Sequence, residues 1–488
     1  MIVVCDAETG RIVRHGRAAH PEAREEADLG VWWEGFRRAA TAEVLTGVAA
    51  LGVAGQRHAV VMLDGRGAPV SPVFLQDEMR AAAAAADLTD ELGGPDGWLK
   101  TVGFVPRPAY TVAVLRWFAR SRPELADRVA MAVAPHDWLT WRLLGGPPEI
   151  TTDRAGASGT GCWCPFTGQY REDLAQMAFG RPIRLPRLIQ PNQAAGSIPD
   201  LGVVITPGTS EEAAAALGLG LGPGDAVISI GAAGTVIAVA DVPCADPAGT
   251  VVDFADATGR HLPQVTVLNA AAVLMFTAAV LGTDLTGLDT LAMQSTPGAH
   301  GLVFLPYLDG EQVPALPHAS GTLTGLRAES MAPAHVARAA VEGMLCGLAD
   351  GLDALRWAGA DVSRVVLIGK AARTATVQTM APLLFGVPVF APEPVNYIAL
   401  GAARQAAWIL SGQPSPPSWP GPQGTLEYGT GDLEVGLAVR EQYRGARERL
   451  HPELASHNRP RRGKHRRGLE LEAVPVEAEA ASLPYSST

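Results

Sequence analysis

The distribution of apolar and polar residues along the chain predicts short strands that alternate with helices. Four runs are apolar, rich in β-branched residues and closed by turn residues, as buried strands are; they cover residues 2–4, 48–53, 60–63 and 365–368. Three longer segments have the composition or the apolar spacing of helices, namely residues 32–43, 341–355 and 399–410. This alternation is typical of a layered α/β protein.

One segment near the middle of the chain contains a complete helix start. Ser210 offers an N-cap hydroxyl, two glutamates follow in the first turn, and alanines continue the helix. A Gly- and Pro-rich stretch at residues 220–224 then interrupts the pattern, and an apolar run at 226–230 predicts the first strand of a new domain. We therefore predict an N-terminal domain over residues 1–222 and a C-terminal domain over residues 223–455.

The last part of the chain differs in composition from the rest. A basic run at residues 459–467 precedes an acidic stretch with several alanines. Such highly charged segments do not bury enough apolar surface to fold. We expect residues 456–488 to be a disordered, solvated tail rather than an arm that binds nucleic acid or membrane.

Composition narrows the class of protein further. The length of 488 residues fits two domains, and a net charge of −11 opposes a nucleic-acid partner, which needs a basic face. The five cysteines are odd in number and scattered, so we expect neither a disulfide framework nor a zinc site.

The N-terminus lacks the features of a signal peptide, and the longest apolar segment, residues 270–281, is too short to cross a bilayer. We expect a cytoplasmic protein without a membrane partner.

Six short motifs occur in order along the chain. They are Gly-Gln-Arg-His at residues 55–58, Pro-His-Asp-Trp-Leu at 135–139, Thr-Asp-Arg at 152–154, Phe-Leu-Pro-Tyr-Leu-Asp-Gly-Glu at 304–311, Val-Glu-Gly at 341–343 and Ala-Leu-Gly-Ala-Ala-Arg at 399–404. Each motif is weak alone. Together, in this order and spacing, they resemble the FGGY family of carbohydrate kinases, and within it most of all the bacterial xylulokinases.

The resemblance implies a fold of two actin/hexokinase-like (ribonuclease H-like) α/β domains, with the sugar and ATP meeting in a cleft between them. It implies transfer of the γ-phosphate of ATP, with Mg²⁺, to a hydroxyl of a ketopentose such as D-xylulose, giving D-xylulose 5-phosphate. The partner implied by the resemblance is a small-molecule sugar. The resemblance also implies that the protein forms a homodimer.

On the sugar side, the resemblance assigns Gln56, Arg57 and His58 to the sugar-contacting loop. A turn histidine satisfied by the backbone is the alternative for His58. Asp77 and Glu78 stand where the family has Asn-Asp after a Trp, which makes them candidates for sugar contact. A solvated acidic turn explains these two residues equally well.

Glu211 and Glu212 stand where the family has an Asp-Asn pair. The resemblance makes Glu211 the general base and Glu212 a substrate-binding residue. A positioned base contributes roughly a hundred- to ten-thousandfold in rate. The alternative is that both glutamates stabilise a helix N-terminus through the helix dipole.

On the nucleotide side, the resemblance identifies two turns and one further residue. They are Gly231, Ala232, Ala233 and Gly234, then Gly369, Lys370 and Ala371, and lastly Asn396. Backbone N–H groups of such turns can cradle a phosphate, although Ala232 and Ala233 lack the hydroxyls usual in the family. Lys370 can reach a phosphate as a point charge, and an exposed loop lysine is the alternative.

The family also opens with a strand and a phosphate-binding turn, and this chain begins in the second strand of that hairpin. We expect the coding region to extend upstream in frame, and a reduced protein is the alternative. For the function, the alternative to a kinase is a catalytically impaired or truncated relative that binds sugar or nucleotide without turnover.

Overall fold

The computed structural model describes residues 1–19, 26–75, 79–199, 201–244, 246, 248–421 and 425–454. Met1–Ala446 form one compact unit, and Arg447–Thr488 form a second. The tail predicted to be disordered, residues 456–488, lies outside the described residues.

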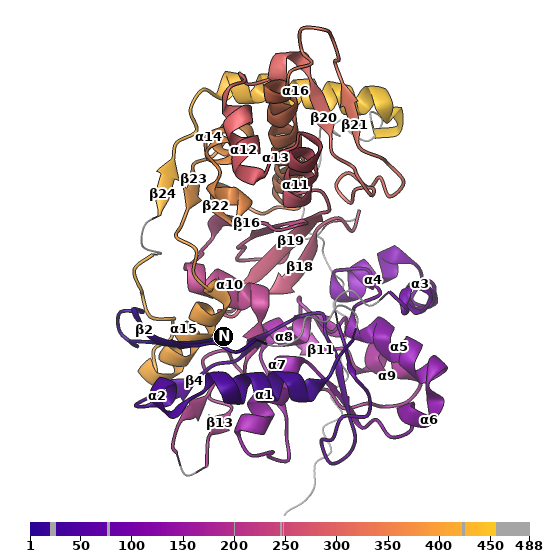
Figure 1. The fold of residues 1–488 in the computed structure, drawn as a ribbon. Helices are drawn as coiled ribbons and strands as arrows, with labels where there is room; N and C mark the ends of the chain where they lie inside the picture. The colour runs from indigo at the N-terminus through magenta and orange to yellow at the C-terminus, as the bar shows by residue number, and fades with distance from the viewer. Residues whose placement is uncertain are drawn as a thin grey trace, which may run out of the picture. The chain divides into compact units, whose positions relative to one another are not determined.

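A seven-stranded sheet dominates the second half of the chain (Figure 1). Its strands, in spatial order, are β18 (Val252–Ala255), β19 (His261–Val267), β17 (Gly234–Ala238), β16 (Gly224–Ile230), β22 (Val362–Ile368), β23 (Val389–Ala391) and β24 (Leu426–Tyr428). β16, β22 and β23 run parallel to one another, and the remaining neighbours are antiparallel. The predicted strands at residues 226–230 and 365–368 are therefore adjacent central strands of this sheet.

Helices cover both faces of the large sheet because neighbouring residues of a strand point to opposite sides. Val236 of β17 faces Gly351 of α13 (Pro333–Trp357), whereas the next residue, Ile237, belongs to the cluster that contains Leu217 of α10 (Glu211–Leu219). Three more helices pack around α13 and gather with it in Figure 1, namely α11 (Ala271–Val280), α12 (Leu285–Met293) and α14 (Ala375–Phe385). A short hairpin of β20 (Val303–Leu305) and β21 (Thr322–Thr324) also contacts this group.

The first half of the chain contains smaller sheets. Four of them are β1 (Ile2–Cys5) with β2 (Ile12–Gly16); β4 (Ala50–Leu51) with β13 (Gly196–Ser197) and β14 (Val204–Ile205); β5 (Ala54–Gly55) with β15 (Thr209–Ser210); and β6 (Val61–Leu63) with β8 (Met131–Val133). The others pair β3 (Glu26–Ala27) with β7 (Val73–Phe74), β9 (Thr151–Thr152) with β12 (Arg187–Leu188), and β10 (Trp163–Cys164) with β11 (Gln169–Tyr170). The strand predicted at residues 48–53 is present in part as β4, and the backbone hydrogen bonds continue toward β5, since the Thr206 and Thr209 N–H groups donate to the Leu51 and Val53 carbonyls.

The helices of the first half surround these strands. They are α1 (Leu29–Ala39), α2 (Ala42–Leu45), α3 (Ala82–Glu91), α4 (Pro95–Val102), α5 (Thr111–Ser121), α6 (Pro123–Ala126), α7 (Pro135–Leu143), α8 (Arg154–Ser158) and α9 (Glu172–Phe179). The helix predicted at residues 32–43 begins earlier, because the Asp28 side chain accepts a hydrogen bond from the Gly30 N–H and caps α1. A core of α3, α5 and α9 residues also includes Val252 and Phe254 of β18.

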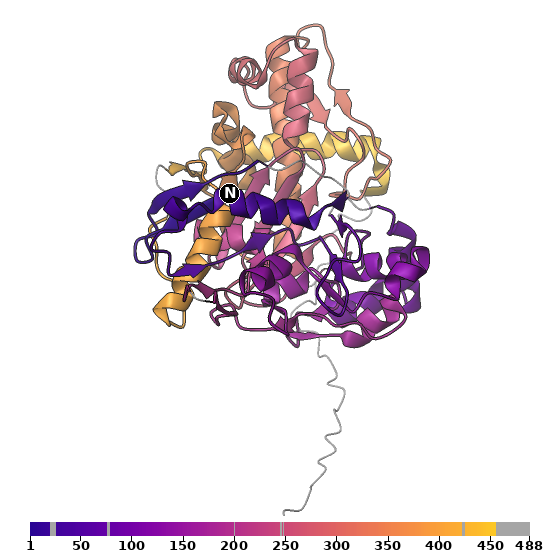
Figure 2. The same cartoon turned by 60° about the horizontal axis from the view of Figure 1, so that its bottom comes forward.

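α15 (Tyr397–Ser411) connects the two halves of the fold. It crosses α10 so closely that a Cβ on Gly401 would lie 1.7 Å from the Ala214 carbonyl oxygen, and one on Gly218 would lie 2.2 Å from that of Tyr397. Only glycine allows two backbones to approach to this degree. α15 also packs against β1, as the orange helix beside the indigo hairpin in Figures 1 and 2 shows.

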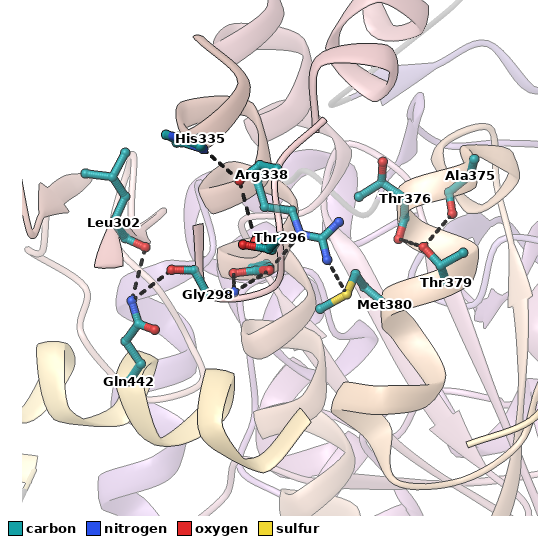
Figure 3. A network of polar contacts seen from close by, with 12 residues as sticks. Thr296, Gly298, Leu302, His335, Arg338, Ala375, Thr376, Thr379, Met380 and Gln442 are labelled. Atoms are coloured by element: carbon teal, nitrogen blue, oxygen red, sulfur yellow. Dashed lines mark hydrogen bonds and ion pairs between the residues drawn. The ribbon is translucent and has the colours of Figure 1, made fainter. Parts of the chain in front are cut away.

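A buried ion pair lies within the helical layer around α13 (Figure 3). Arg338 Nε donates to Glu342 at 2.7 Å, and Arg338 Nη2 lies 2.7 Å from the sulfur of Met380 in α14. Glu342 also accepts from the Gly298 N–H at 3.1 and 3.2 Å. Gln442 of α16 (Leu433–Leu450) donates to the Gly298 carbonyl, so helices distant in sequence meet at one polar cluster.

The remaining sequence-based predictions concern cysteines and membrane spans. All five cysteines are free thiols, and four of them are buried. Among the described residues, no single helix is both long and apolar enough to cross a membrane; α11 and α12 meet the length and composition criteria only as a pair bent by 86°.

Candidate active site

Two neighbouring parallel strands bring the predicted sugar loop and the predicted base together. β5 pairs with β15 so that Gly55 lies opposite Ser210. Gln56 follows the first strand directly, and Glu211 follows the second. Because parallel strands end at the same edge, the loop of residues 56–58 and the start of α10 lie beside each other.

Glu211 is the first residue of α10, and its environment changes its acidity. The Ser210 hydroxyl caps the helix by accepting from the Ala213 N–H at 3.4 Å. Burial raises the pKa of the Glu211 carboxyl to about 7, the charge of Glu212 adds to this effect, and Arg57 opposes it. A pKa close to neutral is the optimum for a general base that works near neutral pH.

Arg57 is enclosed within the protein and binds Glu212. Its side chain has 0% exposure, and its Nη2 lies 3.2 Å from Glu212 Oε2. Nη1 donates to Gln264 Oε1 of β19 at 3.1 Å, and the guanidinium stacks 3.8 Å above the centre of the Phe254 ring. The guanidinium therefore contacts protein groups from both halves of the chain, and contact between Arg57 and sugar stays a prediction.

His58 is held between two aromatic rings. Its imidazole stacks on Tyr110 with ring centroids 4.5 Å apart, and Phe254 lies at 5.5 Å in a tilted arrangement. Burial lowers the pKa of His58 to about 3, with the charges of Arg57 and Arg107 acting in the same direction, so the ring is neutral. Among the described residues, neither His58 Nδ1 nor Gln56 Oε1 has a hydrogen-bond partner. Both atoms suit a ligand that carries hydroxyl groups.

A buried polar layer supports the two strands from behind. His136 Nε2 lies 3.3 Å from Asp137 Oδ1, and Asp153 caps α8 by accepting from the Gly156 N–H at 2.7 Å. Burial raises the pKa of Asp137 to about 7 and that of Asp153 to about 6, and it lowers the pKa of His136 to about 4. These groups belong to the motifs at residues 135–139 and 152–154, and they explain those motifs as supports of the site.

The predicted nucleotide residues follow three adjacent parallel strands. Gly231 follows β16, Gly369 follows β22, and Asn396 follows β23 within a short loop. The carboxyl ends of parallel strands form one edge, where α/β proteins commonly bind ligands. The predicted positions are thus brought together at one edge of the large sheet.

The turn at residues 231–234 is held by the start of α11. The Ala271 N–H donates to the Gly231 carbonyl at 2.9 Å, and the Ala270 and Ala272 N–H groups donate to that of Ala232 at 3.3 and 3.4 Å. Gly231, Ala232 and Ala233 are exposed, and Gly234 is buried. The backbone of this exposed turn is available to a ligand.

A buried carboxylate fixes the strand that leads into α11. Glu311, which is 3% exposed, accepts from the Leu268 and Asn269 N–H groups at 2.8 and 3.3 Å and from Asn269 Nδ2 at 2.9 Å. It also accepts from the N–H of Gln312 at 2.7 Å. Glu311 therefore ties the motif at residues 304–311 to the turn that α11 supports.

The second predicted turn has mixed exposure. Gly369 has φ 106°, and a Cβ there would lie 2.5 Å from the Ile230 carbonyl oxygen, so glycine is required for this close approach. Lys370 is exposed, whereas Ala371 is buried and its carbonyl accepts from the Thr374 hydroxyl. Asn396 caps α15 by accepting from the Ala399 N–H at 2.8 Å.

One strand links the two groups of residues. Gln264 in β19 contacts Arg57, and Val267 in the same strand pairs with Gly234 of the turn. Three residues of strand span about 10 Å, so the sugar-side and nucleotide-side elements share a rigid connection.

Sequence reasoning missed three residues of the site: Tyr110, Phe254 and Gln264. Tyr110 carried a signal, because it is an aromatic residue at the N-cap position of the apolar helix α5. Phe254 and Gln264 lie in ordinary strand patterns about 200 residues away, so nothing local marks them. Asp77 and Glu78, predicted to contact sugar, lie outside the described residues.

The described residues contain no group of three or more His, Cys, Asp or Glu side chains that could hold a metal ion. Mg²⁺ is usually bound by one or two carboxylates together with substrate phosphates and water.

The scaffold and its two groups of loops define a sugar kinase of the actin/hexokinase-like class. The chain belongs to the FGGY family of carbohydrate kinases: the family's N-terminal domain matches residues 2–208, and its C-terminal domain matches residues 226–410. The predicted family, fold class and sugar kinase activity are confirmed.

Known relatives carry more specific names. A xylulose kinase of Streptomyces coelicolor is 40% identical over 424 residues, covering 84% of this chain and 86% of that protein. A xylulose kinase of Escherichia coli is 31% identical over 407 residues, covering 78% and 81%. The crystal structure of a xylulose kinase from Bifidobacterium adolescentis superposes with a TM-score of 0.84 at 36% identity, covering 91% of this chain and 96% of that one. The alternative of a catalytically impaired relative receives no support from these similarities.

Proposed function

We propose that this sugar kinase transfers the γ-phosphate of ATP to D-xylulose. The observation that carries the proposal is the position of the Glu211 carboxyl, which begins α10 beside the loop of residues 56–58 and has a pKa near neutral. Xylulose is a ketopentose, and the relatives are named xylulose kinases, which supports a ketopentose as the substrate.

The reaction follows from groups that the chain provides. Glu211 accepts the proton of a sugar hydroxyl, the hydroxyl oxygen forms a bond to the γ-phosphorus, and the bond from that phosphorus to the β–γ bridging oxygen breaks to release ADP. His58 Nδ1 and Gln56 Oε1 orient the sugar by accepting hydrogen bonds from other hydroxyls. Orientation contributes because it replaces a chance encounter by a fixed geometry.

The nucleotide occupies the edge of the large sheet in this proposal. N–H groups of residues 231–234 and of the turn at Gly369 face the phosphates, and Lys370 adds a positive charge from an exposed position. Mg²⁺ would enter with ATP and neutralise phosphate charge. The sugar belongs to the domain of residues 1–222 and the nucleotide to that of residues 223–455.

The test is sugar-dependent release of ADP by the purified chain with Mg-ATP. D-xylulose is compared with D-ribulose, gluconate and glycerol, and a reaction without sugar is the blank. We expect the highest kcat/KM with D-xylulose. A folded sample that releases no ADP with any of these, or that prefers gluconate, contradicts the proposal.

A further inference from the structure

Two carboxyl groups occupy consecutive positions at the start of α10. Glu211 is the first helical residue and Glu212 the second, and both are half-buried. Two like charges at this separation repel each other more strongly as burial lowers the local dielectric. The helix N-terminus offsets part of this repulsion, but it acts on both groups. A base at Glu211 therefore requires a specific partner for Glu212.

Arg57 provides that partner from a different element. Its Nη2 lies 3.2 Å from Glu212 Oε2 and 3.4 Å from Ser210 Oγ, the hydroxyl that caps the same helix. Contacts from the second half of the chain hold the guanidinium in place, through Gln264 Oε1 at 3.1 Å and the Phe254 ring at 3.8 Å. Within the described residues, Arg57 is thus the junction of the sugar loop, the first turn of α10 and strands β18 and β19.

We propose that Arg57 is a positioning residue that pairs with Glu212, so that this second carboxylate carries a compensated charge and Glu211 can act as the base. The proposal rests on the proposed function, and it names the residue whose positive charge allows two adjacent carboxyl groups at one site. Arg57 acts through Glu212 and Ser210, and it does not need to touch the sugar.

The other charged groups around Glu211 do not take this role. Asp153 interacts with Thr209 of β15, and Asp137 lines a small cavity that Arg57 also lines, but both are carboxyl groups and cannot compensate the charge of Glu212. His58 is neutral. Arg404 is the charged residue of α15 that binds α10, and its Nη1 donates to the Leu217 carbonyl at 2.8 Å, near the opposite end of that helix.

The test follows the pH dependence of kcat/KM for D-xylulose in four variants. R57M keeps an apolar stem on Phe254 but removes the charge, and we expect the acid limb to move to higher pH by about one unit or more. E212Q should move the limb to lower pH, and R57M/E212Q should return it close to the wild-type position. R57K keeps the charge without the planar fork, so its limb should stay in place. A common loss of activity at every pH, with no movement of the limb in R57M or E212Q, overturns the proposal.

A second measurement separates this inference from the proposed function. If the wild type shows no sugar-dependent ADP release, the proposed function fails, and the pair is examined by urea unfolding of R57M, E212Q and the double variant at pH 8. A double variant that loses much less stability than the sum of the two single losses supports the pairing. Additive losses overturn it.

Discussion

The imidazole ring of His58 lies almost parallel to the phenol ring of Tyr110, with an interplanar angle of 6° and a centroid separation of 4.5 Å. Phe254 lies against the same imidazole with ring centroids 5.5 Å apart, so two aromatic rings fix its orientation. A ring held in this way loses little entropy when it accepts a hydrogen bond, which is the physical basis of preorganised binding.

We expect His58→Ala to weaken sugar binding more than it slows the chemical step. One hydrogen bond between uncharged groups contributes about 0.5–1.5 kcal/mol, which corresponds to a KM for D-xylulose raised about two- to tenfold. Tyr110→Ala should raise KM similarly because it removes the stacking surface, and Tyr110→Phe is the matched control that keeps the ring. Equal KM values for His58→Ala and the wild type would show that the ring does not contact the sugar.

Replacement of the base should affect turnover. Glu211→Gln is expected to lower kcat by a factor of roughly a hundred to ten thousand, while calorimetry still detects sugar binding. Glu172→Gln is the control, since Glu172 is the exposed first residue of α9 and occupies the same position in its helix. If both variants keep their activity and lose only a little stability, Glu211 serves the helix dipole instead.

The pH dependence follows from the acidity of Glu211. Its pKa is raised to about 7, and a base acts in its deprotonated form. kcat/KM should therefore fall about tenfold per pH unit below pH 7 and level off above it. A profile that stays flat between pH 5.5 and 8 would contradict the assignment of Glu211 as the base.

The buried carboxyl of Asp137 should make stability depend on pH. Its pKa rises from 3.8 to about 7 on folding, so the folded state binds more protons than the unfolded state within that window. Stability attributable to this group is present at low pH and is lost as pH rises through about 7, by an amount on the order of a few kcal/mol. Asp137→Asn should abolish this loss while its side-chain oxygen still accepts from the Ala134 N–H.

The measurement for Asp137 is the midpoint of urea unfolding at pH 5 and pH 8. When the pH rises from 5 to 8, the unfolding midpoint of the wild type should fall more than the midpoint of Asp137→Asn. Asp173→Asn is the control with the opposite sign, because Arg171 lowers the pKa of Asp173. Equal changes of the midpoint in the wild type and in Asp137→Asn would show that protonation of Asp137 is not linked to stability.

Glu311 connects stability to the nucleotide side. Glu311→Gln replaces one acceptor oxygen by an amide donor that faces backbone N–H groups. We expect a loss of about 1.5–3 kcal/mol in stability and a higher KM for ATP, because the start of α11 no longer holds the turn at residues 231–234. Glu329→Gln, whose side chain is 80% exposed, should change neither. An unchanged KM for ATP in a destabilised Glu311→Gln would restrict this residue to a structural role.

Several elements could be predicted because their determinants are local. β-branched runs marked β16 and β22, and Ser210 marked the start of α10, where its hydroxyl accepts from the Ala213 N–H. Pro333 occurs in the first turn of α13, where its missing N–H costs nothing. The hydrophobic period and the end caps of an element depend on a few neighbouring residues, so they can be recognised from the sequence alone. The motif at residues 55–58 and the role expected of Glu211 came instead from the resemblance to the FGGY family, which six short motifs carry.

The pairing of those elements was decided by the tertiary structure. The strand segments at residues 50–55 pair with segments far along the chain, β4 with β14 and β5 with β15, and the local pattern does not encode these partners. The contact of Arg57 with Gln264 joins residues 207 positions apart, and Arg57 is buried beside Glu212. By itself, the sequence determined several strands and helices, such as β16, β22 and α10, and which side chains can do chemistry. The tertiary structure decided burial and neighbouring charge, and these set the state of each group because desolvation and Coulomb energy depend on distances in space.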